Sequence, residues 1–193
     1  MTLRFYLCET KLGWMGLVLS PEGLRATTLP RPRRDDALRE VAELGALEPA
    51  SDAEAGDIAR WVKALAEGEP AAPSTGSGQA LAGLIDWDGA AGFRRAVLEE
   101  ALRIPRGETR TYGWLAERVG RPRAARAVGR VMATNPLPIV VPCHRVIGSD
   151  GSLRGYGAGL PMKEALLRAE GVEVVPGQRQ SRHRGAELKE VVV

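Results

Sequence analysis

The residues best suited to covalent chemistry are a thiol, an imidazole and a guanidinium in direct succession, at Cys143, His144 and Arg145. A thiolate is the nucleophilic form of cysteine, and nearby imidazole or cationic groups lower the pKa of a thiol. A lone cysteine more often packs as a small hydrophobe, so its neighbours decide between the two interpretations. A histidine and an arginine need polar partners when they are buried, and packing alone would not favour them here. We therefore interpret Cys143 as a nucleophile.

An apolar run directly before the cysteine must position it. Ile139–Val141 is typical of a buried strand or extended segment. Pro142 has no backbone donor and biases the residue before it away from helix. We expect the chain to enter Cys143 in an extended conformation, with the thiol held by buried surroundings and not by a mobile loop.

Two short helices are expected before this run. Thr111 is placed to cap the first, at residues 112–119, and the second covers residues 124–132. The turn between them contains Gly120 and Pro122. Two short helices joined by a tight turn are typical of a helix-turn-helix.

The second of these helices has two different faces. Alanine and valine side chains form one stripe, while Arg123, Arg126 and Arg130 lie on the opposite side. Small residues such as Ala125 and Ala127 would let the helix backbone come close to a groove. Arginines fit phosphate geometry, although a solvated helix face explains the same pattern equally well.

Charge is distributed unevenly along the chain. The formal net charge is only +3, but residues 103–130 carry eight arginines against two glutamates, and residues 35–57 are mostly acidic among their charged positions. Both blocks fit solvated helix faces, but a polyanion partner explains the basic block at least as well, because its positive groups are all arginines.

Composition limits the class of protein. The 193-residue chain is long enough for one domain or two small ones. No stretch reaches the roughly 18 apolar residues of a membrane helix, and the first residues lack a signal-peptide layout, so we expect a cytoplasmic protein without a membrane partner. Two cysteines and two histidines give neither an expected disulfide nor a zinc-ligand spacing. Cys8 is interpreted as a packing residue of the first strand.

The remaining elements are expected from hydrophobic periodicity. Strands are expected at residues 3–8, 14–19 and 24–29, and helices at 36–47, from Asp52 as a cap, and at 91–102. A last helix should begin at Pro161 and stop at Gly171. Its buried face is expected to comprise Met162, Ala165, Leu166 and Ala169.

Glycine, proline and serine crowd residues 68–78, where no periodicity survives. We therefore expect an α+β protein in four parts. An N-terminal domain with a small antiparallel sheet covers 1–75, a linker and entry segment covers 76–90, and a helical domain with the reactive cysteine covers 91–175. The polar tail, 176–193, is expected to be disordered.

Several of these residues together resemble a known family. Pro142-Cys143-His144-Arg145-Val146 is preceded by Asn135-Pro136 and followed by a glycine loop around Tyr156 and by Glu170-Gly171. This pattern is similar to the O6-alkylguanine-DNA alkyltransferases, or methylated-DNA–protein-cysteine methyltransferases, over residues 91–173. The resemblance implies a ribonuclease-H-like N-terminal domain and a winged helix-turn-helix C-terminal domain. It also implies a monomer that acts on double-stranded DNA bearing O6-alkylguanine, with O4-alkylthymine as a further substrate, and that needs no cofactor and no metal.

The resemblance assigns catalytic roles that the residues alone do not. Cys143 would accept the alkyl group, and His144 would act as its base through a bound water. Glu170, which by itself would be interpreted as a surface carboxylate, would orient the imidazole. Tyr112 would donate to the leaving guanine. A thioether formed on the cysteine is stable, so each molecule would react once.

The resemblance also implies a DNA-binding surface and a substrate pocket. Arg126 would enter the duplex and replace a base that has been rotated out into a pocket. The residues expected beside it at the DNA are Ala125, Ala127, Arg123 and Arg130. The residues expected to form the pocket are Asn135, Met132, Tyr156, Gly157 and the main chain at Val146.

The chain departs from the family pattern at three points. Its cysteine and histidine count excludes the structural zinc that some relatives hold in the N-terminal domain. Gly157 stands where the family often has serine, so any contact to the guanine oxygen there must come from the backbone amide. Arg94 stands where relatives commonly have glutamine.

Three other functions fit part of the pattern. A non-catalytic lesion-binding protein would lack the acceptor thiol, which is present here as Cys143. A helix-turn-helix regulator explains the arginine stripe but not a buried Cys-His-Arg sequence. A cysteine hydrolase would turn over repeatedly, whereas an alkyl acceptor stops after one equivalent.

Overall fold

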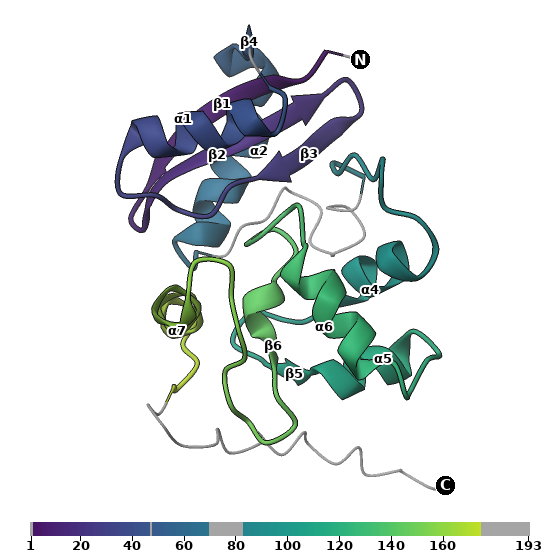
Figure 1. Ribbon diagram of the computed structural model, residues 1–193. Coiled ribbons are helices and arrows are strands. Elements are labelled where there is room, and N and C mark those ends of the chain that lie inside the picture. Colours follow the sequence, from purple (N-terminus) through teal and green to yellow (C-terminus); the bar gives the residue numbers. More distant parts are fainter. Residues whose placement is uncertain (1, 47, 70–82, 175–193) are drawn as a thin grey trace, which may run out of the picture.

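The computed structural model describes residues 2–46, 48–69 and 83–174. It is a mixed α+β structure, with a sheet and two helices in one half and four helices in the other (Figure 1). The expected tail at 176–193 and most of the expected break at 68–78 lie outside the described residues.

The sheet has four strands in the order β3-β2-β1-β4. The strands are β1 (Arg4–Thr10), β2 (Gly13–Ser20), β3 (Gly23–Thr27) and β4 (Glu48–Pro49). The antiparallel pairing of the first three confirms the expected strands, and the short β4 adds a parallel edge that the sequence pattern did not predict.

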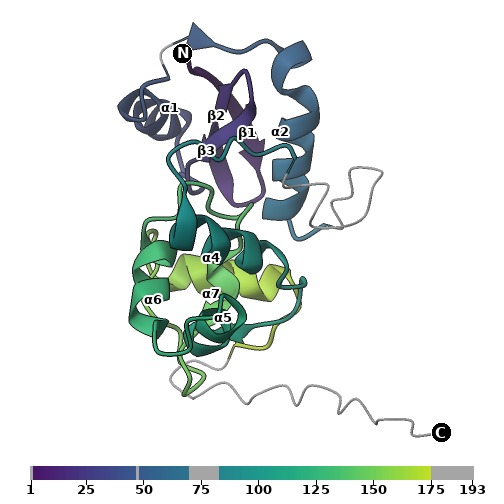
Figure 2. The same cartoon turned by 90° about the vertical axis from the view of Figure 1, so that its right-hand side faces the viewer.

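One helix covers each face of this sheet (Figure 2). Helix α1 (Arg34–Glu43) packs closely on β2, where a Cβ on Gly16 would lie only 2.2 Å from Val41. Helix α2 (Asp52–Ala66) covers the opposite face. The sequence predicted Asp52 as the cap of this helix, but the cap is Ser51, which forms a capping box with Glu54. Asp52 is the first helical residue, so the helix begins one residue earlier than expected.

Within the described residues, the other half contains four α-helices, a one-turn 3-10 helix and a two-stranded parallel ladder. The helices are α4 (Gly92–Leu102), α5 (Tyr112–Arg118), α6 (Ala125–Ala133) and α7 (Leu160–Ala169), and the ladder pairs β5 (Arg110–Thr111) with β6 (Val146–Ile147). The expected start of α5 is confirmed, since the Thr111 hydroxyl accepts a hydrogen bond from the amide of Trp114 at 3.0 Å. The α5–turn–α6 arrangement agrees with the expected pair of short helices.

The buried face of α7 differs from the prediction. Lys163, Leu166 and Leu167 are buried, whereas Ala169 is exposed. The helix therefore turns a lysine inward, because that ammonium finds backbone acceptors: the carbonyl of Val146 at 2.6 Å and that of Arg154 at 3.3 Å.

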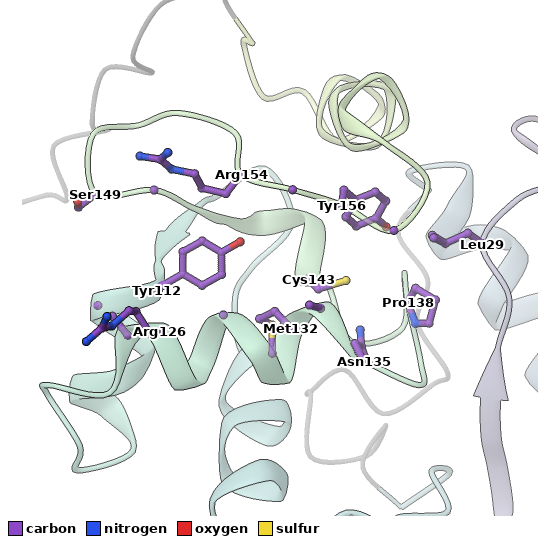
Figure 3. A pocket seen from close by; sticks show the side chains of 17 residues that line it. Leu29, Tyr112, Arg126, Met132, Asn135, Pro138, Cys143, Ser149, Arg154 and Tyr156 are labelled. Carbon is purple, nitrogen blue, oxygen red and sulfur yellow. The ribbon is translucent and has the colours of Figure 1, made fainter.

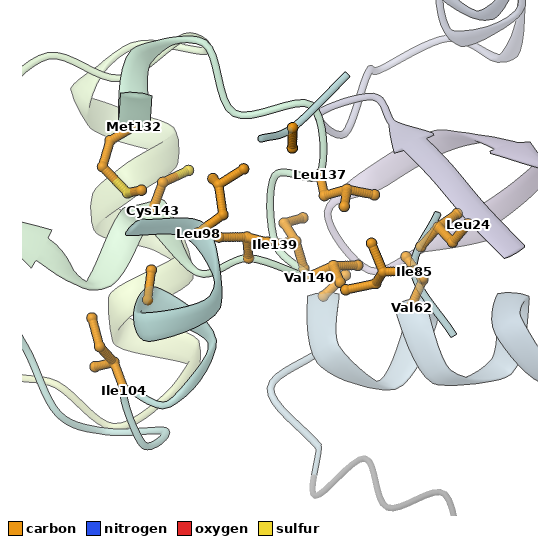
Figure 4. Close-up of a cluster of buried hydrophobic side chains, with 14 of the residues drawn as sticks. Leu24, Val62, Ile85, Leu98, Ile104, Met132, Leu137, Ile139, Val140 and Cys143 are labelled. Atoms are coloured by element: carbon orange, nitrogen blue, oxygen red, sulfur yellow. The ribbon is translucent and has the colours of Figure 1, made fainter. Parts of the chain in front are cut away.

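One hydrophobic cluster runs through both halves (Figure 4). Leu24 and Val62 contribute from the sheet side, Ile85 lies between, and Leu137 and Val140 contribute from the helical side. The two halves therefore share buried apolar surface, and the segment that precedes Cys143 is part of it.

We expect Thr111→Ala to lower the free energy of unfolding by about 1 kcal/mol, because the first turn of α5 loses its side-chain acceptor. Thr111→Ser keeps a hydroxyl at this position and should retain most of the stability. Urea unfolding followed by circular dichroism measures both variants. An alanine variant as stable as the parent chain would contradict this role of the cap.

Candidate active site

A cavity of about 770 Å³ opens between α6 and the loop that precedes α7 (Figure 3). This volume is in the range of small-molecule sites. Eight of the residues expected at the site line it: Tyr112, Ala125, Arg126, Met132, Asn135, Cys143, Tyr156 and Gly157. The structure thus brings together residues from four separate segments of the helical half.

Cys143 lies at the floor of this cavity, and its sulfur points into it (Figure 3). The thiol is on a one-turn 3-10 helix, Cys143–Arg145, and is only 7% exposed. Its surroundings therefore fix the thiol, as expected from the sequence.

The prediction of a strand or extended segment at Ile139–Val141 is wrong. Residues 137–141 form a tight turn in which the amide of Val141 donates to the carbonyl of Leu137 at 2.8 Å, and Ile139 has a left-handed φ of 75°. Prolines at positions 136, 138 and 142 remove backbone donors, so this segment cannot pair as a central strand. The apolar run indicated burial correctly, since these side chains are buried, but it did not determine the backbone path.

His144 is directly behind the thiol and is almost completely buried. Its Nε2 lies 2.9 Å from Oε1 of Glu170. Burial alone would oppose the charge of Glu170, but hydrogen bonds from His144 and Arg145 hold the pKa of this carboxyl at about 2. An ionised carboxylate can only accept, so Nε2 carries the proton and Nδ1 has a free lone pair.

That lone pair is available to a proton. Nδ1 of His144 is buried and has no hydrogen-bond partner among the described residues. Burial lowers the pKa of His144 below its ordinary value, and Arg145 and Lys163 lower it further while Glu170 opposes them. The imidazole is therefore neutral near pH 7 and can act as a base.

Arg145 completes this group of buried charges. Its guanidinium donates to both carboxylate oxygens of Glu170, at 2.8 and 2.7 Å, and to the carbonyl of Ile104 at 2.7 Å. Paired, hydrogen-bonded charges can stay buried where isolated ones cannot. The need of a buried His-Arg pair for partners was visible in the sequence, and the resemblance implied Glu170 as the partner of His144, but the pairing of Arg145 with the same carboxylate was not predicted.

The thiol itself is held in its protonated form at rest. Burial raises the pKa of Cys143, while the side chains of Asn135, Lys163 and Tyr156 act in the opposite direction. A base is therefore needed to form the thiolate. The second thiol, Cys8 in β1, is buried away from this site, and burial raises its pKa to about 11.

Tyr112 and Arg126 lie at the end of the cavity away from Leu29 and Pro138 (Figure 3). Burial and the neighbouring Cys143 raise the pKa of Tyr112, so its hydroxyl keeps its proton and can donate. Arg126 is exposed at the rim, and Arg130 is exposed on the same helix as expected, whereas Arg123 is exposed in the turn just before α6. Among the described residues, these three arginines form no ion pair with a carboxylate.

Two other expected site residues, Ala127 and Val146, do not line the cavity, and Asn135 has a second, supporting role. Ala127 is partly buried on α6 and does not line the cavity. Val146 is fully buried, and its carbonyl accepts from Lys163. Asn135 both lines the cavity and braces the turn, since its amide donates to Val141 O at 2.9 Å and its oxygen accepts from Leu137 N at 3.0 Å.

The sequence reasoning missed several lining residues: Leu29, Gly113, Gly129, Ala133, Pro138, Gly148, Ser149, Arg154 and Gly155. It also missed the buried position of Lys163. Burial lowers the pKa of this lysine to about 8, and the nearby Cys143 acts against the shift. A lysine next to a predicted helix start gives no sign of burial, because its position depends on contacts with distant backbone carbonyls.

The structure also accounts for Arg94. Its guanidinium donates to Oγ1 of Thr134 at 2.7 Å and to the carbonyl of Thr134 at 2.5 Å. Thr134 is the C-cap of α6, where a cation is favourable to the helix dipole. Arg94 therefore ties α4 to the end of the arginine-bearing helix.

The described residues contain no group of three or more histidines, cysteines or carboxylates placed to hold a metal ion. None of the described helices is both long and apolar enough to cross a bilayer.

Comparison with known proteins identifies the family. Residues 92–172 match the model of the "6-O-methylguanine DNA methyltransferase, DNA binding domain". The chain is 53% identical over 79 residues to the methylated-DNA–protein-cysteine methyltransferase of Methanosarcina acetivorans, covering 41% of this chain and 51% of that protein. It is 54% identical over 83 residues to the protein of the same name from Mycobacterium leprae, covering 43% and 50%. The aligned part thus spans about half the length of these curated relatives.

The likeness to a solved structure extends further along the chain. The crystal structure of Mycobacterium tuberculosis OGT in complex with DNA has a TM-score of 0.67 and 32% sequence identity, covering 86% of this chain and 92% of that one. The fold and the cavity thus define a two-part α+β protein with a buried thiol below an arginine-bearing helix. The chain belongs to the methylated-DNA–protein-cysteine methyltransferase family.

We expect Glu170→Gln to lower the free energy of unfolding at pH 7 by about 3 kcal/mol, because Arg145 is left without its buried counter-ion. The Glu170 pKa is lower in the folded chain, so its contribution to stability is present above about pH 4.3 and is lost as the pH falls toward about 2. Denaturant unfolding between pH 2 and 7 should show a shallower decrease for the variant.

Glu164→Gln is a matched control for this measurement. Glu164 is on the same helix but pairs with the exposed Arg168. Its variant should keep the pH dependence of the parent chain. Parallel pH curves for the parent chain and Glu170→Gln would contradict the buried carboxylate interpretation.

Proposed function

We propose that this protein repairs alkylated DNA by transferring an alkyl group from O6-alkylguanine to the sulfur of Cys143, once per molecule. One observation carries the proposal: a buried thiol faces a cavity of about 770 Å³ and is backed by His144 and Glu170, which are 2.9 Å apart. Family membership supports the same activity. O4-alkylthymine is a further substrate in this proposal, and no cofactor or metal takes part.

The proton of the thiol leaves through His144. Nδ1 accepts it by way of a bound water, and Glu170, fixed by Arg145, stabilises the imidazolium that forms. The thiolate then attacks the alkyl carbon, so that an S–C bond forms while the C–O6 bond breaks. The electron pair moves into the guanine, and Tyr112 donates its proton to the ring. The product is a thioether and an unmodified guanine.

The alkylated base must rotate out of the DNA duplex to enter the cavity, because a protein side chain cannot reach O6 of a guanine that is still paired and stacked. Arg126 at the rim fills the space left in the duplex, and Ala125 and Ala127 let α6 approach. Arg123 and Arg130 contact phosphates, which is consistent with their exposure and lack of ion pairs among the described residues.

The other pocket residues shape the site for guanine. Met132 and Tyr156 form walls, the Gly157 amide contacts the guanine oxygen, and Asn135 braces the turn. The main chain at Val146 reads the exocyclic amine in this proposal, although Val146 does not line the cavity in this structure and its carbonyl accepts from Lys163.

The proposal also includes the fold type and the bounds of each domain. The sheet-containing half is a ribonuclease-H-like domain at 1–75, and the segment 76–90 leads to a winged helix-turn-helix domain at 91–175. The protein acts as a monomer in the cytoplasm on double-stranded DNA.

Incubation with duplex DNA containing one O6-methylguanine should add one methyl group to the protein. Intact-mass analysis followed by peptide mapping should place it on Cys143 and not on Cys8, whose pKa burial raises to about 11. Cys143→Ala should gain no mass. Repeated turnover, or a methyl group removed from DNA by the alanine variant, would contradict the proposal.

Arg126→Ala should slow transfer from duplex DNA by about 30-fold, because about 2 kcal/mol of unstacking cost is no longer offset. The reaction with free O6-methylguanine needs no duplex and should change less than about twofold on the same grounds. Single-turnover rates from quenched samples measure both. Equal losses with duplex and free base would contradict the role of Arg126.

Arg130→Ala, one turn away, should weaken binding to damaged and undamaged duplexes equally. It should also reduce the slope of log affinity against log salt concentration by about 1.

A further inference from the structure

One wall of the cavity comes from the sheet-containing half. The other lining residues fall between positions 112 and 157, but Leu29 follows β3. Leu29 is partly buried, and its side chain points toward the cavity from the end where Pro138 and Tyr156 lie, away from Tyr112 and Arg126 (Figure 3). The N-terminal half of the chain therefore contributes directly to the site.

Leu29 is held in register with the turn before Cys143. The amide of Thr27 donates to the carbonyl of Pro136 at 2.9 Å, and the Thr27 hydroxyl donates to the carbonyl of Pro138 at 2.8 Å. Thr27 is only 4% exposed, so water does not compete for these bonds. Pro138 lines the same cavity, and the two bonds fix its position relative to Leu29.

Leu29 lies at the end of the cavity that the sulfur faces. The Cys143 sulfur points to the side where Leu29, Pro138 and Tyr156 gather, whereas Tyr112 and Arg126 lie toward the other end (Figure 3). The alkyl group must be at the sulfur when it is transferred. Sulfur, reacting carbon and leaving oxygen align during a displacement, so the rest of an alkyl chain projects sideways, against this end of the cavity.

Gly157 and Leu29 share this part of the wall. A Cβ built on Gly157 would lie 3.4 Å from Cδ1 of Leu29, which is van der Waals contact. The glycine has no side chain to occupy this space, so the leucine determines how much of it stays open. Side chains at both positions would compete for the same volume.

We propose that Leu29 sets the upper size of the alkyl group that Cys143 accepts. Short alkyl chains fit beside the sulfur, whereas branched or aromatic groups meet the leucine. The proposal rests on the proposed alkyl transfer and adds its substrate range. It also gives the sheet-containing half a role in specificity.

The test compares single-turnover rates of the full chain on duplexes containing O6-methylguanine or O6-benzylguanine. Leu29→Ala should raise the ratio of the benzyl to the methyl rate by about tenfold, the size expected when a pocket gains room for a few carbon atoms. Leu29→Phe should lower the same ratio. A ratio within about twofold of the parent chain for both variants would overturn the proposal.

A double-mutant comparison separates an effect on the cavity volume from general damage to the fold. Gly157→Ala should lower the ratio, and Leu29→Ala in the same chain should restore it, because the two side chains share one volume. Independent effects of the two changes would count against a shared wall. Leu38→Ala removes a leucine from the α1 side of the sheet and should leave the ratio unchanged.

The outcomes remain separable from those of the proposed function. Failure of the parent chain to take a methyl group on Cys143 would refute alkyl transfer, whereas transfer with an unaltered size preference in the variants refutes only the role of Leu29. Thermal unfolding shows whether each variant is folded. If Leu29→Ala does not fold, Leu29→Val carries the test, with a smaller increase expected and no increase contradicting the proposal.

Discussion

The structure depends on one buried carboxylate. Glu170, at the end of α7, accepts from Nε2 of His144 and from two nitrogens of Arg145. Each of these groups would be costly to bury alone, and together they satisfy one another. The same contacts determine which histidine nitrogen carries the proton and hold the residues after Cys143 in place. Stability and the chemistry of the site therefore share a single set of hydrogen bonds.

The position of this group requires both halves of the molecule. The turn before Cys143 is packed in a hydrophobic cluster that continues to Leu24 and Val62 of the sheet-containing half (Figure 4). Thr27 adds two hydrogen bonds to carbonyls of that turn. The left-handed φ of Ile139 is held within these contacts. The sheet thus supports the cavity as well as its own core.

Elements with local signals were predicted well. The cap of α5 at Thr111 and the start of α7 near Pro161 depend on residues within one turn of the helix end. The segment at 139–141 was predicted wrongly, because an apolar run indicates burial for a strand and for a turn alike. Asp52 was taken as a cap although Ser51 has the role; both are favourable at helix starts, and only the backbone geometry separates them.

The sequence alone predicted Cys143 as the nucleophile and placed the arginines of α6 on its outward face, because residue type and helical periodicity are local properties. The tertiary structure decided which distant groups meet them. Glu170 faces His144, Arg94 reaches Thr134, Lys163 turns inward to Val146, and Leu29 closes the cavity. Such contacts join residues 17 to more than 100 positions apart. They depend on the path of the whole chain, which no short-range pattern contains.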